Sequence, residues 1–329
     1  MKGMAYSPRM SATMGTSAPQ QEIAVKGIDE SLRFGLGRNW SDFIAQHFAE
    51  ERVDSSREHL LKVLRVESLA GLSFLDIGCG SGLHSLAARR AGAAQVVGFD
   101  YDGDSVATSE KVRDMTVGAT APWTVEQGSV LDDARMRQLA KADIVYSWGV
   151  LHHTGELWKA MDNAIIPRKP DGVVYLALYS SDQYVDPPTD HWVRIKRAYN
   201  QAGPIGKKFM QWRHALKLFR IGLKDGEMPW TIVRNYGLRG MDFWIDIKDW
   251  LGGWPIEFAS YAQVERWGER HGLQVVHAIL GEGCTEYILA DPRQNQHWGA
   301  QERRRAAACK PLTGPFNKLD GWMWSASLP

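Results

Sequence analysis

The sequence predicts a doubly wound α/β fold built on a mostly parallel, seven-stranded sheet. Between residues 72 and 179, short apolar runs alternate with segments of helical periodicity. Successive parallel strands need crossover connections, and helices then cover both faces of the sheet. A glycine-rich segment, LDIGCGSG at residues 75–82, stands where the first strand meets the first helix. Two further apolar runs near residue 280 predict an antiparallel hairpin at one edge.

Each expected element is bounded by a change of periodicity. The strands are Leu72–Ile77, Gln95–Phe99, Trp123–Gln127, Asp143–Ser147, Gly172–Tyr179, Leu273–Leu280 and Thr285–Ala290. The helices between the first five are Gly82–Ala91, Ser105–Thr116, Asp132–Ala140 and Glu156–Ile166. The last two strands are separated by Gly281-Glu282-Gly283, a composition typical of a hairpin turn.

The remaining segments predict a domain organisation around this core. Residues 181–258 are too many for a bare loop and have helical patterns, so we expect a helical insertion that acts as a substrate lid. In the segment RFGLGRNWSDFIAQHF, the aromatic residues Phe34, Trp40 and Phe43 are expected to form a helical cap over the ligand site or to pack in the core. The core then comprises residues 31–180 and 259–291. Residues 1–30 and 292–329 are expected to be tails, the first flexible and the second packed through Trp322 and Trp324.

Composition excludes several classes of protein. Lys and Arg (39) nearly balance Asp and Glu (38), which gives no global attraction to DNA. The three cysteines, Cys79, Cys284 and Cys309, are isolated, which argues against a disulfide framework or a cysteine-rich zinc site. We find no apolar run of about 18 residues and no signal-peptide pattern. A cytoplasmic protein is therefore expected.

The glycine segment predicts a ligand site. In doubly wound sheets, ligands bind outside the carboxyl ends of the strands, and glycine lets the backbone turn sharply and approach closely. Asp76 lies inside this segment, and Asp100 ends the next strand, twenty residues after Gly80. The spacing is G-x-G-x-G, whereas dinucleotide sites use G-x-G-x-x-G. A carboxylate at Asp76 suits a ligand with an ammonium group better than a pyrophosphate.

These residues resemble the class I S-adenosylmethionine-dependent methyltransferases over roughly residues 70–180. LDIGCGSG, VVGFD, GSVLD and ADIVYSWGVLHHT are similar to successive motifs of that family, which has a Rossmann-like fold. The resemblance implies S-adenosylmethionine as cofactor, with its methionine part near Asp76, Gly78, Cys79 and Gly80. It implies that Asp100 holds the ribose, that Tyr101, Ser129 and Val130 border the adenine, and that Ser147 lies under the sulfonium. Ser129 stands where the family often has an acid, so Asp132 is an alternative contact.

The segment WGVLHHTGE, residues 148–156, supplies the candidate catalytic residues. His152 and His153 follow the fourth strand, where either could remove a proton from the acceptor or simply form the wall of the pocket. Glu156 could face one of them at helical spacing. A metal site needs further ligands that the neighbouring sequence lacks, so no metal is predicted.

Two surfaces of the insertion are candidates for binding. In IGKKFMQWRHALKLFRIGLK, one helical stripe is apolar, formed by Ile205, Phe209, Trp212, Leu216, Phe219 and Leu223. A second stripe is basic, formed by Arg213, Lys217, Arg220 and Lys224. The basic stripe could hold an anionic substrate, acidic lipid or RNA, or could be a solvated face over a packed apolar stripe.

The second surface is GMDFWIDIKDWLGGWPIE. Asp242, Asp246 and Asp249 share a helix face with aromatic residues around them, which suits an amine or a sugar ring, or is ordinary packing. We expect Trp148, Asp246 and Trp250 to contact the substrate. This segment also resembles a bacterial methyltransferase subgroup of ubiquinone-type and natural-product-tailoring enzymes.

The predicted function is therefore methyl transfer from S-adenosylmethionine to a small molecule, such as a natural product, sugar or quinone-like compound, more readily on O or N than on S or C. One alternative is an RNA-directed methyltransferase that uses the basic insertion. Others are a nicotinamide-dependent oxidoreductase and a relative that binds the cofactor without turnover. A homodimer is a further expectation.

Overall fold

A computed structural model of the chain describes residues 48–293 except 185–186, 225, 239–242 and 282–283, together with residues 32, 35, 37 and 44. Several sequence predictions lie outside these residues: the tails at 1–30 and 294–329, Phe34, Trp40 and Phe43 of the expected cap, Asp242, and the tip of the expected hairpin turn.

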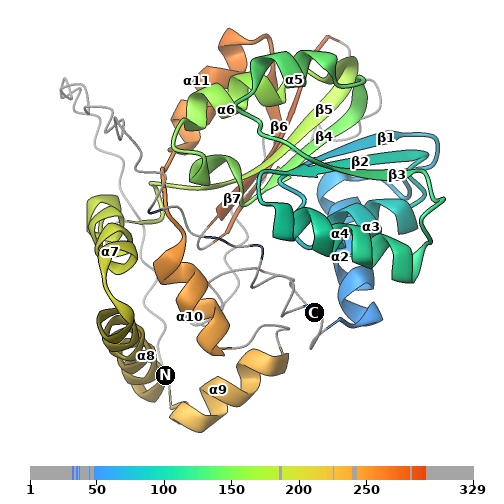
Figure 1. Cartoon of the computed structure of the whole chain (residues 1–329). Helices are drawn as coiled ribbons and strands as arrows, with labels where there is room; N and C mark the ends of the chain where they lie inside the picture. Colours follow the sequence, from blue (N-terminus) through green and yellow to red (C-terminus); the bar gives the residue numbers. More distant parts are fainter. Residues whose placement is uncertain are drawn as a thin grey trace, which may run out of the picture.

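The core is one seven-stranded sheet in the order β3-β2-β1-β4-β5-β7-β6 (Figure 1). The strands are β1 (Ser73–Ile77), β2 (Gln95–Asp100), β3 (Trp123–Gln127), β4 (Ala142–Trp148), β5 (Arg168–Tyr179), β6 (Gln274–Leu280) and β7 (Cys284–Ala290). The first five pair in parallel, and β7 is antiparallel to both β5 and β6. The predicted fold class is confirmed. Only β6 of the hairpin lies at the edge, because β7 inserts between β5 and β6.

Helices cover both faces of the sheet (Figure 1). On one face lie α2 (Glu50–Leu64), α3 (Leu83–Arg90) and α4 (Gly103–Thr116), whose apolar side chains join those of β1, β2 and β4. On the other lie α5 (Asp133–Gln138), α6 (Leu157–Ala164) and α11 (Tyr261–Arg270). The sequence analysis did not predict α2 as a separate helix. Its buried residues, Val53, Leu60, Val63 and Leu64, have the helical spacing that would have indicated it.

In the described residues between β5 and α11 lie the helices α7 (Thr189–Gln201), α8 (Pro204–Lys224), α9 (Pro229–Leu238) and α10 (Phe243–Gly252). They lie to one side of the sheet (Figure 1) and share an apolar cluster that includes Trp192, Leu218 and Trp250. Lys196 of α7 is fully buried in this group, with its ammonium 4.1 Å from the centre of the Trp250 ring. Burial lowers the pKa of Lys196 to about 7, although Asp249 and Asp246 oppose the shift.

Most of the apolar stripe of α8 is exposed rather than packed, although Phe219 stacks on Phe243 of α10 (5.4 Å). Ile205 is 88% exposed and Phe209 is 68% exposed. The helix packs instead through a different face, whose buried residues are His214, Ala215, Leu218 and Gly222. Gly222 on this face lets α9 approach closely. A Cβ on Gly222 would lie only 2.3 Å from Cδ1 of Ile232 in α9.

Among the residues that the structure describes, no helix is both long enough and apolar enough to cross a membrane.

The packing of α11 on the sheet gives a direct test of this core. Trp267 is 1% exposed, belongs to the α5–α6–α11 cluster, and donates its indole N–H to Asp162 (2.8 Å). We expect Trp267→Ala to lower the free energy of unfolding in urea by about 3–5 kcal/mol, because it leaves a large cavity. Arg266→Ala, at the exposed neighbouring position, should change it by less than about 0.5 kcal/mol. Equal effects of the two variants would contradict the assigned packing.

Candidate functional site

The candidate site lies at the carboxyl ends of β1, β2 and β4. The chain runs from β1 to β2 and β3 on one side and then crosses back to β4 on the other, so the connections diverge between β1 and β4. Such a divergence leaves a crevice between neighbouring loops, where ligands of doubly wound sheets bind. The predicted cofactor residues Asp76, Asp100 and Ser147 all come from the ends of these three strands.

The glycine loop after β1 is held tightly by its neighbours. The N–H groups of Gly78 and Cys79 both donate to the carbonyl of Phe99 at the end of β2 (2.8 and 3.0 Å). Gly78 has a φ of 76°, and a Cβ there would lie 2.4 Å from Cγ1 of Val150. A larger residue would therefore be both strained and in collision. The glycine loop thus packs directly on the segment WGVLHHTGE. This contact brings the predicted cofactor motif against the segment that carries His152 and His153.

Asp100 organises the loop from the neighbouring strand. Its Oδ2 accepts from the N–H of Gly80, and its Oδ1 accepts from the N–H of Asp102 (both 2.9 Å). Burial raises the pKa of Asp100, against the effect of these backbone hydrogen bonds. Asp102 in turn caps α4 and accepts from the N–H of Gly37 (2.9 Å). Gly37, in the segment before α2, therefore lies at the start of α4.

Asp76 is the most deeply buried acid of the site, at 2% exposure. Burial raises the pKa of Asp76 to about 7, with a smaller contribution from the charge of Asp100. The hydroxyl of Ser85, in the first turn of α3, donates to Oδ2 of Asp76 (2.7 Å) and opposes the shift. A buried carboxyl of this kind is ionised at low cost only when a cation lies against it.

The residues expected around the adenine lie at the ends of β2 and β3. Tyr101, which follows β2, is 58% exposed. Ser129 accepts from the N–H of Leu131 (3.1 Å), and Val130 accepts from the side chain of Asn163 (2.8 Å). Asp132, the alternative to Ser129, caps α5 by accepting from two backbone N–H groups.

Ser147 and Trp148 point to opposite faces of the sheet because they are neighbours in β4. The hydroxyl of Ser147 is buried and donates to the carbonyl of Ile77 (3.0 Å), so it ties β4 to β1 below the glycine loop. Trp148 lies on the face covered by α2 and α3, with its ring centre 6.1 Å from that of His84.

The two histidines of WGVLHHTGE form a short 3₁₀ turn, η2 (Leu151–His153), and differ in their surroundings. His152 is fully buried, with its ring 4.1 Å from Tyr179 and its Nδ1 accepting from the N–H of Tyr179 (3.4 Å). Burial, and then the charges of His153 and Lys196, lower the pKa of His152 well below its ordinary value. His153 places its Nδ1 2.7 Å from the carbonyl of Pro255, which can only accept, so Nδ1 carries the proton.

A glutamate from a distant segment completes this turn. Glu257 accepts from the N–H of Leu157 (2.9 Å) and so caps α6, while its own N–H donates to the carbonyl of His152 (2.8 Å). Burial raises the pKa of Glu257 to about 7, although backbone hydrogen bonds from Leu157 and Gly155 oppose the shift. Glu156, which the sequence suggested as the partner of the histidines, is exposed and precedes α6. Within the described residues, no group of three or more His, Cys, Asp or Glu side chains could hold a metal ion.

A second polar cluster lies beside Trp148 on the α2–α3 face. In the register of the sheet, Glu286 of β7 pairs with Ala177 of β5, and Ala177 pairs with Trp148 of β4. Both oxygens of Glu286 lie within hydrogen-bond distance of Nε2 of His59 from α2 (3.1 and 3.0 Å). The hydroxyl of Tyr175 also donates to Glu286. Burial alone would raise the pKa of Glu286, but His59 and Tyr175 hold it below its usual value.

The residues expected to bind substrate on α10 are buried. Asp246 is 4% exposed and Trp250 is 3% exposed. The Trp250 ring stacks on Tyr184 at 6.0 Å and meets Tyr179 edge-on at 5.8 Å, so a row of aromatic rings leads from the histidines to α10. Asp246 acts electrostatically on Lys196, and Lys196 donates to the carbonyl of Trp250.

The sequence analysis missed His59, Tyr175, Glu257 and Glu286. One signal was present, since Glu286 is an acid inside the otherwise apolar strand CTEYILA and such an acid needs a buried partner. Glu257 has no comparable signal, because its partners are about a hundred residues away and are backbone groups.

Comparison with known proteins identifies the family. A family model described as a methyltransferase domain matches residues 40–220, more than half of the chain. The ribosomal protein L11 methyltransferase of Xanthomonas campestris pv. campestris is 34% identical over 90 residues, which are 27% of this chain and 26% of that protein. The corresponding protein of Ralstonia nicotianae is 30% identical over 92 residues, 28% of this chain and 26% of the relative. The chain thus spans about a quarter of the length of these curated relatives.

Among solved structures, PKMT2 from Rickettsia typhi in complex with AdoHcy is similar in fold, with a TM-score of 0.50 and 15% identity. The similarity covers 73% of this chain and 53% of that one. The glycine loop and the two carboxyls at the strand ends fit a cofactor that carries an ammonium group and a ribose. These observations leave the nicotinamide-dependent alternative without support, and the chain belongs to the class I S-adenosylmethionine-dependent methyltransferases.

Proposed function

We propose that the protein transfers the methyl group of S-adenosylmethionine to an oxygen or nitrogen atom of a small molecule. The observation that carries this proposal is the placement of Asp76 and Asp100 on adjacent strand ends around one glycine loop. Their carboxyls would take the two polar parts of the cofactor, the ammonium group and the ribose hydroxyls. The glycines Gly78 and Gly80 would let the backbone approach the methionine part.

The bound cofactor supplies an electrophilic methyl group, which leaves the protein two tasks. The first is to orient the acceptor in line with that methyl group. The second is to accept a proton when the acceptor is a hydroxyl or a protonated amine. The aromatic rings of Tyr179, Tyr184 and Trp250 beside the histidine turn support an apolar or aromatic acceptor, because small-molecule sites combine apolar walls with few polar groups. The helices α7–α10 would form the lid over it.

We further propose His59, held by Glu286, as the group that accepts the proton. A carboxylate that hydrogen-bonds one nitrogen of an imidazole fixes the orientation of the ring and leaves its other nitrogen for the proton of the acceptor. The charged and titratable groups that face this imidazole are Glu286 of β7, Tyr175 of β5 and His84 of α3. His152 is a weaker candidate because its depressed pKa disfavours protonation, and His153 is held by Pro255 as part of the wall.

Incubation with isotopically labelled S-adenosylmethionine and a cell extract tests the proposed activity. We expect mass spectrometry to detect a small-molecule product that is heavier by one labelled methyl group, which replaces a hydrogen. Asp100→Ala should abolish both this product and the binding of S-adenosylhomocysteine in a calorimeter, because the loop loses its support. Label that appears only in protein or RNA would contradict a small-molecule acceptor.

Asp76→Asn should weaken cofactor binding and stabilise the folded protein at pH 8. The raised pKa of Asp76 means that its contribution to stability is full below about pH 4 and is lost as the pH rises to about 7. The asparagine variant should therefore melt higher than the wild type at pH 8, by about 5 °C or more, with little gain near pH 4. It should bind S-adenosylhomocysteine at least about tenfold more weakly, since the ammonium loses its partner.

Asp143→Asn is the matched control for this variant. Although burial opposes it, Lys169 and Ser73 hold the pKa of Asp143 below its ordinary value. The control should therefore lose stability at pH 8 and leave cofactor affinity unchanged. A higher melting temperature of Asp143→Asn at pH 8 would contradict the electrostatic account.

His59→Gln should reduce kcat by about a hundredfold and remove the acidic limb of its pH profile, with unchanged affinity for S-adenosylhomocysteine. Glu286→Gln keeps the size of the side chain but removes its charge, so the His59 ring loses its ionic partner and kcat should fall by about tenfold. His153→Ala should leave the shape of the profile unchanged. A lost acidic limb in His153→Ala, together with a normal profile in His59→Gln, would transfer the role to His153.

A further inference from the structure

The insertion exposes most of the apolar row along α8. Its exposed members are Ile205 (88%), Phe209 (68%), Trp212 (48%), Leu216 (51%) and Leu223 (50%). The neighbouring α9 adds Met228 (41%), Trp230 (64%) and Val233 (37%) at its start. Single exposed apolar residues are ordinary on protein surfaces, whereas a contiguous row of this size indicates a binding surface.

A basic row runs parallel to the apolar row along the same helix. Arg213, Lys217, Arg220 and Lys224 follow at spacings of four, three and four residues, about a quarter turn around α8 from the apolar row. The helix contains no Asp or Glu. In the part of the chain that the structure describes, none of the ion pairs involves these four side chains.

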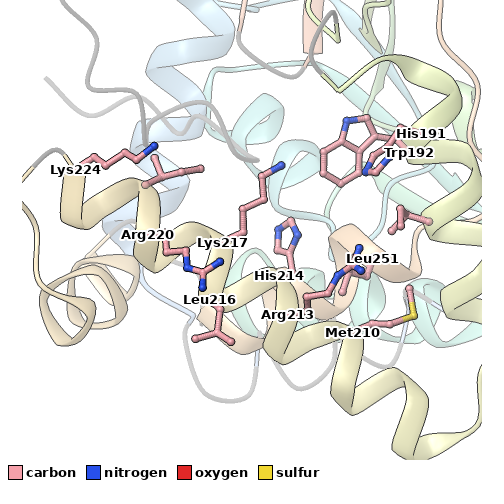
Figure 2. A pocket seen from close by; sticks show the side chains of 12 residues that line it. His191, Trp192, Met210, Arg213, His214, Leu216, Lys217, Arg220, Lys224 and Leu251 are labelled. Carbon is pink, nitrogen blue, oxygen red and sulfur yellow. The ribbon is translucent and has the colours of Figure 1, made fainter.

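A cavity of about 480 Å³ lies between this basic row and α7 (Figure 2). The basic side chains approach it from α8, and His191 and Trp192 approach it from α7 (Figure 2). The ammonium of Lys217 lies 5.5 Å from the centre of the Trp192 ring. None of the described residues that line the cavity is acidic. Burial, followed by the charge of Lys217, lowers the pKa of His214 to about 4, as expected where positive charges are not compensated.

We propose that α8 and the start of α9 dock on a membrane surface that contains anionic phospholipids. The apolar row would enter the interface between head groups and acyl chains, and the basic row and its cavity would hold head-group phosphates. Helices with Phe, Trp and Leu on one face and Lys and Arg beside it bind anionic membranes in this way. The long basic side chains can keep their stems against apolar surface while their charges contact phosphate.

The arrangement of charge favours a membrane over the other occupants. RNA or a soluble phosphate compound would use the basic row and the cavity but would leave the exposed apolar row in water. A second copy of the chain, related by two-fold symmetry about this face, would bring two basic rows close together without acids between them. This proposal goes beyond methyl transfer and does not depend on it, because attachment is measured without turnover.

Co-sedimentation of the full chain with lipid vesicles tests the proposal. We expect binding to vesicles of phosphatidylcholine mixed with phosphatidylglycerol and little binding to phosphatidylcholine alone. The triple variant Arg213→Gln, Lys217→Gln and Arg220→Gln should weaken binding by about a hundredfold. The double variant Phe209→Ser and Leu216→Ser should weaken it by at least about tenfold. Because these side chains are exposed or line the cavity, thermal unfolding of both variants should match that of the wild type.

A matched control variant tests whether vesicle binding depends on where the positive charges lie or only on how many there are. Lys111→Gln, Arg137→Gln and Arg266→Gln remove three exposed cations from the core helices and should leave vesicle binding nearly unchanged. Equal loss in this control, or equal binding to neutral and anionic vesicles, would overturn the proposal. It would also be overturned if pyrophosphate or RNA bound the basic row while vesicles did not. The proposal would likewise be overturned if the only effect of the apolar variant were to convert a dimer to a monomer, as measured by sedimentation velocity.

Discussion

The contact between the glycine loop and Val150 holds the two halves of the site together. Gly78 brings the backbone after β1 against the segment that follows β4, and these are the strands between which the connections diverge. The same loop is anchored to β2 by the Phe99 carbonyl and by Asp100. A side chain at position 78 would push these strand ends apart, so the geometry of the cofactor side and of the acceptor side depends on one missing Cβ.

The site also contains several buried acidic side chains. The groups that offset the cost of burying each carboxyl differ from one to the next. Glu286 is stabilised as a charged group by His59 and Tyr175. Glu257 receives backbone N–H groups at the start of α6, yet burial still raises its pKa to about 7. Asp76 accepts hydrogen bonds from the hydroxyl and the backbone N–H of Ser85, yet burial raises its pKa to about 7 as well. A carboxyl with little compensation from the protein is suited to a cation brought by a ligand, because the ligand then relieves a cost that the fold already bears.

The fold and the cofactor side could be predicted from the sequence because their signals are local. Apolar runs of strand length and the glycine spacing of residues 75–82 each depend on neighbours within a few residues. The roles assigned to Tyr101, Ser129, Val130 and Ser147 remain predictions, although all of them lie at the expected strand ends. The position of β7 inside the sheet and the exposure of the α8 stripe were not predictable in this way. An amphipathic pattern shows that a helix has two faces, but the partner decides which of them is buried.

The sequence by itself determined the order along the chain of the strands and of the helices between the first five strands, and it determined the glycine loop. It also determined the placement of Asp76 and Asp100 at neighbouring strand ends, since parallel strands bring their carboxyl ends to one edge. Only the tertiary structure decided which side chains meet across long separations. It placed Glu257 on the histidine turn, His59 on Glu286, and Gly222 rather than the apolar stripe of α8 against α9. The physical reason is that burial and close contact depend on two segments at once. The sequence of one segment does not indicate which distant segment will pack against it.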